Sequence, residues 1–286
     1  MSGSLQSGPT STFVVTGSSS GIGEACTTRL ARAGHRVIAG VRQEADAKRL
    51  AALDDSIVPV ILDVTDQAHI DALVERLDGL GTGGLDGLVN NAGIARGGPI
   101  EFLPLDDWRT QLEVNLVGQI AVTKALLPAL RRRQGRLVFI GSISGRVATP
   151  LVSPYSASKH AIEAVAESLR EELRPWGLAV SVIEPGAVRT PIWAKGRAFA
   201  DELEARLPPE ARELYDDAID DVRRGIDHQE RIGVPPDRVA AVVERALTAA
   251  RPRYRYLVGR DAKAAGLLER ILPDRTMASI TRRLGP

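Results

Sequence analysis

Short runs of apolar residues alternate along this chain with longer stretches whose apolar residues recur with helical spacing. The short runs are rich in Val and Ile and predict buried β-strands, whereas the longer stretches predict amphipathic helices. The predicted strands are residues 12–16, 36–41, 58–62, 87–89, 137–140, 180–183 and 254–258. The predicted helices are residues 22–33, 44–53, 68–77, 106–133, 154–174 and 237–250. This alternation predicts an α/β fold with a doubly wound parallel sheet of about seven strands and helices on both faces.

The alternation of strands and helices breaks after Thr190. Residues 191–235 contain several prolines and many acidic residues, and the chain becomes basic from residue 251 onward. Residues 1–11 are rich in Ser and Gly and predict a flexible leader. We therefore expect one domain at residues 12–260, which includes the 191–235 segment, and a basic C-terminal tail at residues 261–286.

Composition narrows the class of protein. The chain has 286 residues, of which 44% are hydrophobic, and this is enough for the core of one α/β domain. A formal net charge of +1 argues against nucleic acid as a partner. Cys26 is the only cysteine, so neither an internal disulfide nor a cysteine metal site is expected. With no apolar run long enough to span a bilayer and no signal-peptide core, we expect a cytoplasmic protein.

A glycine-rich turn joins the first predicted strand to the first predicted helix, in the order Thr16-Gly17-Ser18-Ser19-Ser20-Gly21-Ile22-Gly23. Such a turn presents backbone N–H groups and the positive end of the helix dipole to a pyrophosphate. It lacks the Lys of a Walker loop, and the alternative to a dinucleotide site is a plain flexible turn. The candidate cofactor ligands in this turn are Gly17, Ser19, Ser20, Gly21, Ile22 and Gly23.

The end of the second predicted strand indicates which dinucleotide binds. A carboxylate at this point would accept hydrogen bonds from the ribose 2′-hydroxyl and favour NAD. The chain has Arg42 instead, whose guanidinium can pair with the 2′-phosphate of NADP. We therefore expect NADP. In the alternative, Arg42 is a solvated loop residue, the nearby Glu44 and Asp46 oppose the phosphate, and NAD binds.

Tyr155 and Lys159 lie four positions apart in a predicted helix and therefore on one face, and Ser142 precedes them. A free phenol has a pKa of about 10, which a nearby ammonium lowers because it favours the phenolate. The pair suits proton exchange with an alcohol or a carbonyl group. Taken alone, the spacing favours the alternative, a surface tyrosine beside a solvated lysine.

Taken together, these features resemble the short-chain dehydrogenase/reductase family in its single-domain Tyr-x-x-x-Lys form, which has a Rossmann-like fold. The similarity extends from about Thr12 to Val258. The motifs that carry it are Thr16-Gly17-x-x-x-Gly21-x-Gly23, Asp63-Val64, Asn90-Asn91-Ala92-Gly93, Asn115, Ser142, Tyr155-x-x-x-Lys159 and Pro185-Gly186 with Thr190.

The resemblance implies a catalytic role for four side chains. Tyr155 would be the general acid/base, and Ser142 would hydrogen-bond the substrate oxygen. Lys159 would lower the pKa of Tyr155 and hold the nicotinamide ribose. Asn115 would mark a helix distortion that holds a proton-relaying water, or it is a satisfied structural amide. No metal is needed, since these side chains supply the acid and the polarisation.

The resemblance also implies the remaining cofactor contacts. Asp63 would bind the adenine amino group, unless it caps the following helix together with Thr65. The backbone at Asn91 and Gly93 would run close to the ribose, and Val188 would bind the nicotinamide carboxamide. The full set beyond the glycine-rich turn and Arg42 is Asp63, Val64, Asn91, Ala92, Gly93, Tyr155, Lys159, Pro185, Gly186, Val188 and Thr190.

Family members bind substrate beneath the segment after the sixth strand, so the resemblance implies that residues 191–235 form a lid. This segment resembles members that act on sterols, retinoids and other lipophilic alcohols, and its apolar mouth would be lined by Pro191, Ile192, Trp193 and Phe199. The tail predicts an amphipathic helix that packs on the body or on a neighbouring subunit, with a membrane surface as the alternative. Its apolar positions are Leu267, Leu268, Ile271, Leu272, Met277, Ile280 and Leu284.

We therefore expect an NADP-dependent oxidoreductase that moves a hydride between nicotinamide and a lipophilic secondary alcohol, ketone or aldehyde. A homo-dimer or homo-tetramer would form through helices 106–133 and 154–174. Two alternatives belong to other classes. A non-enzymatic dinucleotide sensor would have no need of the Ser, Tyr and Lys side chains, and a nucleotide-sugar epimerase or dehydratase would carry a longer C-terminal substrate domain.

Overall fold

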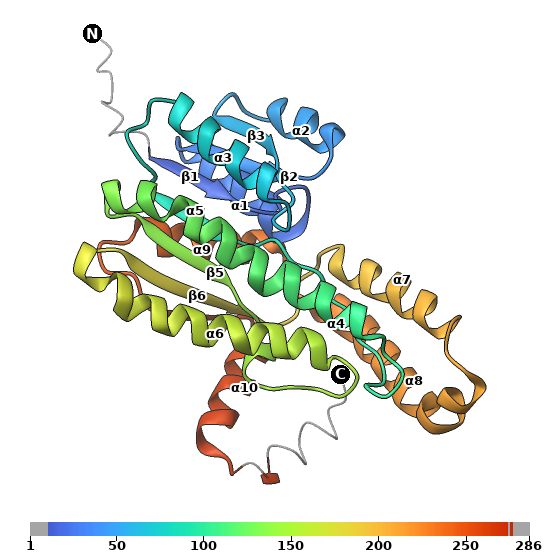
Figure 1. Cartoon of the computed structure of the whole chain (residues 1–286). Coiled ribbons are helices and arrows are strands. Elements are labelled where there is room, and N and C mark those ends of the chain that lie inside the picture. The colour runs from blue at the N-terminus through green and yellow to red at the C-terminus, as the bar shows by residue number, and fades with distance from the viewer. Residues whose placement is uncertain (1–10, 274, 277–286) are drawn as a thin grey trace.

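Within the residues that the structure describes, 11–273, 275 and 276, seven strands form one sheet (Figure 1). The computed structural model orders them β3-β2-β1-β4-β5-β6-β7, and every neighbouring pair is parallel. The strands are β1 (Thr12–Val15), β2 (Arg36–Val41), β3 (Ile57–Ile61), β4 (Gly87–Asn90), β5 (Arg136–Ile140), β6 (Ala179–Pro185) and β7 (Arg255–Val258). The predicted doubly wound parallel sheet is confirmed. The predicted leader, apart from Ser11, lies outside the described residues.

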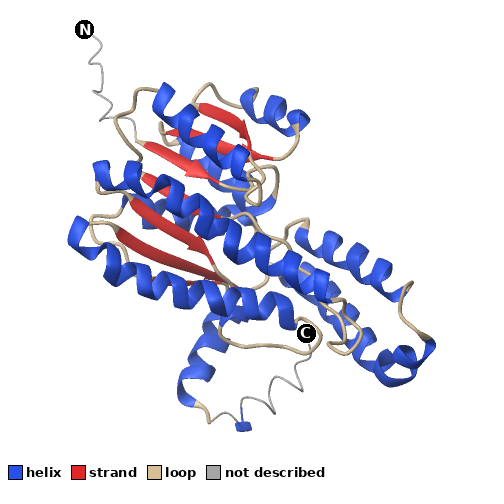
Figure 2. Cartoon of the chain, in the orientation of Figure 1, coloured by secondary structure: helices blue, strands red, loops and turns tan. Residues whose placement is uncertain are grey.

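Alternate side chains of each strand enter two separate cores, one on each face of the sheet. Phe13 and Val15 of β1 pack against the face covered by α1 (Gly21–Arg32), α2 (Glu44–Ala51) and α9 (Pro236–Thr248). Val14 enters the opposite core, beneath α3 (Gln67–Gly79), α5 (Gly118–Arg133) and α6 (Ser153–Leu173). Figure 2 shows the sheet between these two helical layers. Because both faces are covered, the strands read as continuous apolar runs rather than as alternating ones.

The strand order reverses beside β1, which pairs with β2 on one side and with β4 on the other. The chain leaves β1 and β4 toward opposite faces of the sheet, and this opens a crevice at their carboxyl ends. Ligands of doubly wound sheets bind in such a crevice. The fold therefore places the glycine-rich turn after β1 and the Asn90–Gly93 segment after β4 at the same position.

The predicted helix over residues 106–133 contains an interruption. It begins as α4 (Leu105–Leu112), passes through one π-helical turn, η1 (Glu113–Val117), and continues as α5. Turns of this kind widen a helix locally and are frequent at functional sites. The interruption is centred on Asn115, the residue at which the family resemblance places a helix distortion.

Residues 191–235 form a helical hairpin that extends away from the sheet (Figure 1). It consists of α7 (Ile192–Glu204) and α8 (Pro209–Ile232), and it begins and ends at a bridge between Val188 and Val234. Salt bridges from Arg197 to Asp227 and Glu230 join the two helices.

The basic tail begins with α10 (Arg260–Ile271), which packs on the body of the protein. Ala262 is fully buried and Gly266 lies against Leu257 of β7, while Leu267 and Ile271 are exposed. The predicted apolar positions Met277, Ile280 and Leu284 lie outside the described residues. Two short 3₁₀ turns, η2 (Ile143–Gly145) and η3 (Arg174–Trp176), complete the described elements. None of the helices over 11–273 combines the length and the apolar character that a bilayer crossing requires.

Candidate active site

A cavity of about 1090 Å³ opens at the carboxyl ends of the strands and continues beneath α7 and α8. It brings together residues from many segments of the chain, from the glycine-rich turn to α10. Of the predicted site residues, those that line it are Gly17, Ser19, Ser20, Gly21, Ile22, Arg42, Asp63, Val64, Asn91, Ala92, Gly93, Asn115, Ser142, Tyr155, Lys159, Pro185, Gly186, Val188 and Thr190. The exception is Gly23, which lies behind the turn. A side chain at Gly23 would collide with the Gly17 carbonyl and the Asn91 amide.

The glycine-rich turn is held in place by the loop after β4. Asn91 donates from Nδ2 to the carbonyls of Thr16 (2.9 Å) and Gly17 (3.1 Å). In return, the Thr16 hydroxyl accepts from the backbone N–H groups of Asn91 and Ala92, both at 2.9 Å. Gly17 and Gly21 have φ of 66° and 59°, a conformation that favours glycine. The turn therefore presents its N–H groups and the N-terminus of α1 to the cavity in a fixed geometry.

Arg42 and Asp63 lie at the far end of the cavity, beyond β2 and β3. Arg42 is exposed, lines the cavity and directly follows β2. Partial burial disfavours the Asp63 carboxylate, but hydrogen bonds from Thr65 and the charge of Arg42 outweigh it and lower the pKa of Asp63. The cap of α3 is Asp66, which accepts from Ala68 N, so the alternative interpretation of Asp63 as the helix cap is wrong. Asp63 instead closes a turn with Thr65.

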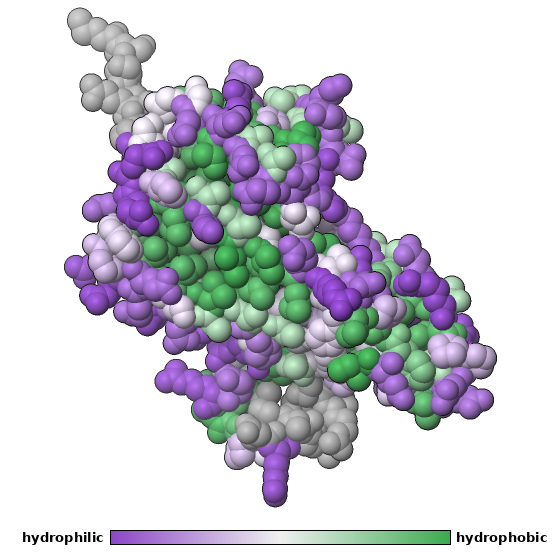
Figure 3. Space-filling view, in the orientation of Figure 1, coloured by the Kyte–Doolittle hydropathy of each residue, from purple (hydrophilic) through white to green (hydrophobic). Residues whose placement is uncertain are grey.

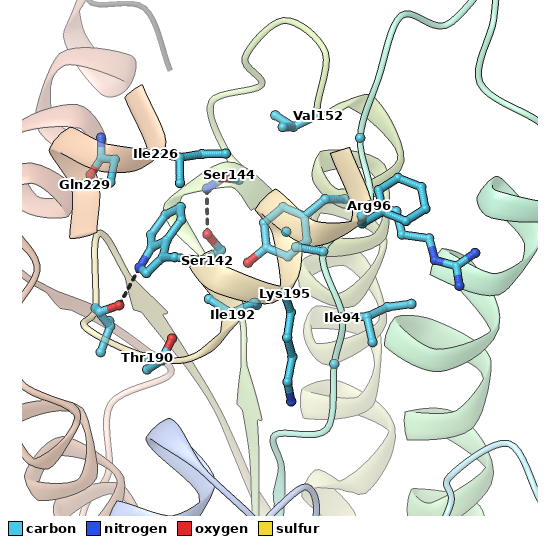
Figure 4. Close-up of a pocket in the computed structure, with 18 of the residues that line it drawn as sticks. Ile94, Arg96, Ser142, Ser144, Val152, Thr190, Ile192, Lys195, Ile226 and Gln229 are labelled. Carbon is cyan, nitrogen blue, oxygen red and sulfur yellow. Dashed lines mark hydrogen bonds between the residues drawn. The ribbon is translucent and has the colours of Figure 1, made fainter. Parts of the chain in front are cut away.

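Ser142, Tyr155 and Lys159 meet on the other side of the cavity. Ser142 follows β5 and caps η2, accepting from Ser144 N at 3.1 Å (Figure 4). Tyr155 and Lys159 come from the first turns of α6. Lys159 donates from Nζ to the Ile140 carbonyl at 2.7 Å, and this nitrogen lies 5.7 Å from the centre of the Tyr155 ring.

The protonation of this group of side chains is set mainly by burial. Burial raises the pKa of Tyr155, although the facing Ser142 hydroxyl opposes the shift. Burial lowers the pKa of Lys159 to about 8, while the carboxylate of Glu163 opposes it. In the ligand-free chain, the phenol is therefore not made acidic by its lysine, contrary to the expectation from the spacing alone. Burial is the larger cause of the Tyr155 shift, and Lys159 directs a hydrogen bond to the Ile140 carbonyl.

Asn115 uses its side chain to hold the loop after β4. Its Oδ1 accepts from Ile94 N (2.8 Å), and its Nδ2 donates to Ile94 O (3.0 Å) and to Ser158 Oγ (3.2 Å). The side chain is therefore a satisfied amide, while the π-helical turn around it supplies the predicted distortion. Gln111, one turn earlier, supports the same loop through Arg96 N and Ile94 O. Sequence reasoning missed Gln111, although two amides four apart in a helix were a visible signal.

The loop after β6 is anchored from two distant segments. Ala187 N donates to Asp261 of α10 at 2.6 Å, and the Asp261 carboxylate occupies the space that a side chain at Gly186 would fill. Trp193 of α7 donates from its indole to the Val188 carbonyl at 2.7 Å. Asp261 was not predicted, because it is far from this loop in sequence and sits in no motif.

The outer part of the cavity is lined by apolar and charged side chains of the helical hairpin. Pro191, Ile192, Trp193 and Phe199 all line it, as do residues of α8 such as Ile226. In Figure 4, Ser142 faces a space bounded by Ile192, Ile226 and Val152. Arg96 crosses from the loop after β4 to the ring of Phe199, 5.2 Å from its centre, and pairs with Asp107.

Comparison with known proteins agrees with this geometry. Residues 11–201 match the family described as short chain dehydrogenase. An NADPH-dependent 3-dehydrocapnine reductase of Ornithobacterium rhinotracheale is 35% identical over 274 residues, covering 93% of this chain and 94% of the relative. Retinol dehydrogenase 5 of Mus musculus is 37% identical over 277 residues, covering 93% and 86%.

A solved structure supports the same assignment at the level of the fold. A short chain dehydrogenase from Burkholderia cenocepacia, in complex with NADP, superposes with a TM-score of 0.72 at 25% identity, covering 96% of this chain and 97% of the other. The sheet order, the cavity at the switch point and the family match agree: this chain belongs to the short-chain dehydrogenase family and is an oxidoreductase.

Proposed function

We propose that this protein is an NADP(H)-dependent oxidoreductase acting on a lipophilic secondary alcohol, ketone or aldehyde. The observation that carries the proposal is one continuous cavity with two different halves. Its inner half holds the glycine-rich turn, Arg42 and the Ser142–Tyr155–Lys159 group, and its outer half combines apolar side chains such as Trp193, Phe199 and Ile226 with charged ones such as Lys195 and Arg197. The apolar side chains suit a substrate with one oxygen on a hydrocarbon frame.

The inner half fits a dinucleotide. The turn at α1 would hold the pyrophosphate, and Asp63 with Val64 would meet the adenine. The backbone at Ala92 and Gly93 would run close to the ribose. The 185–190 loop would bind the nicotinamide amide through Val188 and Thr190. Side chains at Gly17 and Gly21 would collide with, or press closely on, Ala92 and Thr190, so glycine lets these segments pack closely around the turn. When bound, the nicotinamide supplies or accepts the hydride.

The three reactive side chains divide the remaining work. Ser142 Oγ would hold the substrate oxygen within reach of the Tyr155 hydroxyl. Tyr155 would give a proton to that oxygen in reduction and take it back in oxidation. Since burial raises its pKa, the phenol keeps its proton at neutral pH and is ready to donate it.

Lys159 would connect the phenol to the ribose and to solvent. An ammonium has three donors, and the Ile140 carbonyl accepts one of them. The others would bind ribose hydroxyls. A hydrogen bond from Asn115 to Ser158 joins the π-helical turn to α6, the helix that carries Lys159. We propose that the widened backbone of this turn holds the water that returns protons from bulk solvent.

NADP is the proposed cofactor because of charge at the far end of the cavity. Arg42 occupies the position at which a carboxylate would select the 2′-hydroxyl of NAD. Its positive charge also helps to lower the pKa of Asp63. The NADPH-dependent relative and the NADP-bound neighbour support the same choice. NAD is the alternative that the variant below tests.

The helical hairpin of α7 and α8 is the proposed substrate lid. Trp193 of the hairpin donates a hydrogen bond to Val188 of the 185–190 loop. A movement of the lid would therefore also move the loop that is proposed to hold the nicotinamide. The relative named retinol dehydrogenase supports a lipophilic substrate of the retinoid or sterol type. Water exclusion by such a lid would favour hydride transfer.

A homo-dimer or homo-tetramer is proposed through α5 and α6. Figure 3 shows apolar residues gathered over the face where these helices lie in Figure 1. Val117, the last residue of the π-helical turn, is 46% exposed, and Ile120, in the first turn of α5, is 38% exposed.

Tyr155→Phe is expected to reduce kcat by about 10²–10⁴-fold, because the ring remains while the transferable proton is lost. Binding of NADPH, followed by its fluorescence, should change little. The matched control is Tyr215→Phe, on the outer surface of the hairpin, where the hydroxyl bonds Glu101. Unchanged turnover in Tyr155→Phe would favour the non-enzymatic sensor instead.

Arg42→Ala is expected to raise KM for NADPH by about 10–100-fold, since a charge-assisted contact to the 2′-phosphate contributes about 1.5–3 kcal/mol. KM for NADH should stay close to that of the wild type. Lys48→Ala removes the same charge from the exposed side of α2, outside the cavity, and serves as the control. An equal loss for both cofactors, or none for either, would contradict the assignment of Arg42.

Reduction of a series of 2-alkanones should become more efficient as the chain lengthens. Each buried methylene contributes about 0.8 kcal/mol, so kcat/KM should rise about fourfold per carbon until the cavity is filled. Ile226→Ser should flatten the series, whereas Leu214→Ser, on the exposed side of α8, should not. A flat series in the wild-type enzyme would rule out a lipophilic substrate.

Charged substitutions at the α5 surface test the assembly. The double variant Val117→Glu with Ile120→Glu should sediment as a monomer in analytical ultracentrifugation, while the wild-type protein sediments as a dimer or tetramer, because paired carboxylates cannot be buried cheaply at an interface. Leu53→Glu, on an equally exposed apolar residue after α2, should leave the assembly intact. A monomeric wild-type protein would end the proposal.

A further inference from the structure

A second group of charged side chains lies behind Lys159, outside the cavity. Glu163 stands one helical turn after Lys159 on α6, and Glu184 stands beside it on β6, just before Pro185. Glu184 is fully buried and Glu163 is 7% exposed. Arg255 of β7 donates to Glu163 Oε2 at 2.9 Å and brings its Nε within 2.6 Å of Glu184 Oε1.

The same group extends to the Ser142 loop and to the C-terminal helix (Figure 1). Arg146, one residue after η2, lies 3.6 Å from Glu184 Oε2 and pairs with Glu269 of α10. Gly141 and Gly145, on either side of Ser142, lack the side chains that would press on Glu163. The Glu163 carboxyl therefore lies directly beneath the loop that presents Ser142.

The two carboxyl groups have more oxygens than donors. Glu163 Oε1 and both oxygens of Glu184 are buried without a hydrogen bond from the described residues. The Nε of Arg255 is close to Glu184, but its N–H points to Glu163 Oε2 at 3.3 Å, so this contact is an ion pair only. Buried acceptors of this kind require a donor. A proton shared between the two carboxyls would satisfy an oxygen of each.

The electrostatics agree with this geometry. Burial, together with the neighbouring Glu163, raises the pKa of Glu184 to about 7, although Arg255 and Arg146 oppose the shift. Glu163 in turn is the charge that opposes the loss of the Lys159 proton. The other titratable groups that face the pair are Tyr254, which directly precedes β7 and donates from its hydroxyl to the Glu163 carbonyl, and Glu269 on α10.

We propose that Glu163 and Glu184 share one proton, and that Glu163 is a positioning residue whose remaining charge keeps Lys159 protonated and directed at Ile140. The second half of the proposal depends on the role proposed above for Lys159, and the first half does not. The two carboxyl groups place negative charge on the side of Lys159 that faces away from the cavity. Their titration adds a negative charge behind the lysine as the pH rises.

The shared proton is tested without any assay of activity. A carboxyl whose folded-state pKa is raised from 4.5 to about 7 stabilises the fold below this window and loses that contribution as the pH rises through it. Glu184→Gln removes this loss. The melting temperature of Glu184→Gln relative to the wild type should therefore increase between about pH 5 and about pH 8. A difference that is independent of pH would overturn the shared proton.

A second measurement uses the wild-type protein and does not depend on the folding of a variant. Infrared difference spectra should show the C=O stretch of a protonated carboxyl that persists at about pH 6, where ordinary carboxyls are ionised. Its loss on further titration to about pH 8 would agree with the proposal. Absence of the band at the lower pH would overturn it.

The effect on Lys159 is tested by the pH dependence of carbonyl reduction with NADPH. In Glu163→Gln, the alkaline limb of kcat/KM should move to lower pH by about one unit, because an uncompensated buried lysine loses its proton earlier. Glu167→Gln, one turn further on the exposed side of α6, is the control and should keep the wild-type limb.

The outcomes separate this inference from the proposed function. If Glu163→Gln melts earlier but keeps the alkaline limb of the wild type, Glu163 is merely structural and the positioning role is wrong. If Tyr155→Phe keeps full turnover, the proposed chemistry fails, while the melting and infrared results still decide whether the carboxyls share a proton.

Discussion

The ammonium group of Lys159 lies in the protein interior, where only 5% of the residue is exposed and where the Ile140 carbonyl accepts its hydrogen bond. Removing such an ion from water costs several kcal/mol unless other groups replace the lost solvation. Here the replacements are the end of β5 and the carboxylate of Glu163. Both belong to elements that also carry the reactive groups, since β5 leads into Ser142 and α6 carries Tyr155. Solvation of the lysine and alignment of the other two side chains are therefore achieved by the same contacts.

The glycine-rich turn is likewise held in place by contacts within the protein. Its conformation is fixed by Asn91 and Thr16, which exchange hydrogen bonds across the point where the strand order reverses. The lack of a side chain at Gly23 allows the first turn of α1 to approach the Gly17 carbonyl. Because the turn is held by the protein itself, little conformational entropy is lost when a dinucleotide binds. The fold thus prepares both the cofactor end and the reactive end before a ligand arrives.

The sequence was sufficient for features that depend on neighbours in the chain. Apolar runs located every strand, and glycine spacing with the Tyr155–Lys159 pair located the cavity. It was insufficient where a residue acts through a distant partner. Asp66 rather than Asp63 caps α3, and the Asp63 side chain instead closes a turn with Thr65. The pKa of Tyr155 followed burial rather than the adjacent lysine, and burial is a property of the packed chain.

The C-terminal helix shows why such distant partners matter. In sequence it belongs to a basic tail, whose apolar spacing predicts a helix that packs on the body or on a neighbouring subunit. In the structure, Asp261 at its beginning holds Ala187 of the nicotinamide loop, and Glu269 near its end holds Arg146 behind the Ser142 loop. The two loops that would contact nicotinamide and substrate are thus both tied to one helix. Through these two contacts α10 supports both loops of the candidate site, although none of the sequence motifs lies within it.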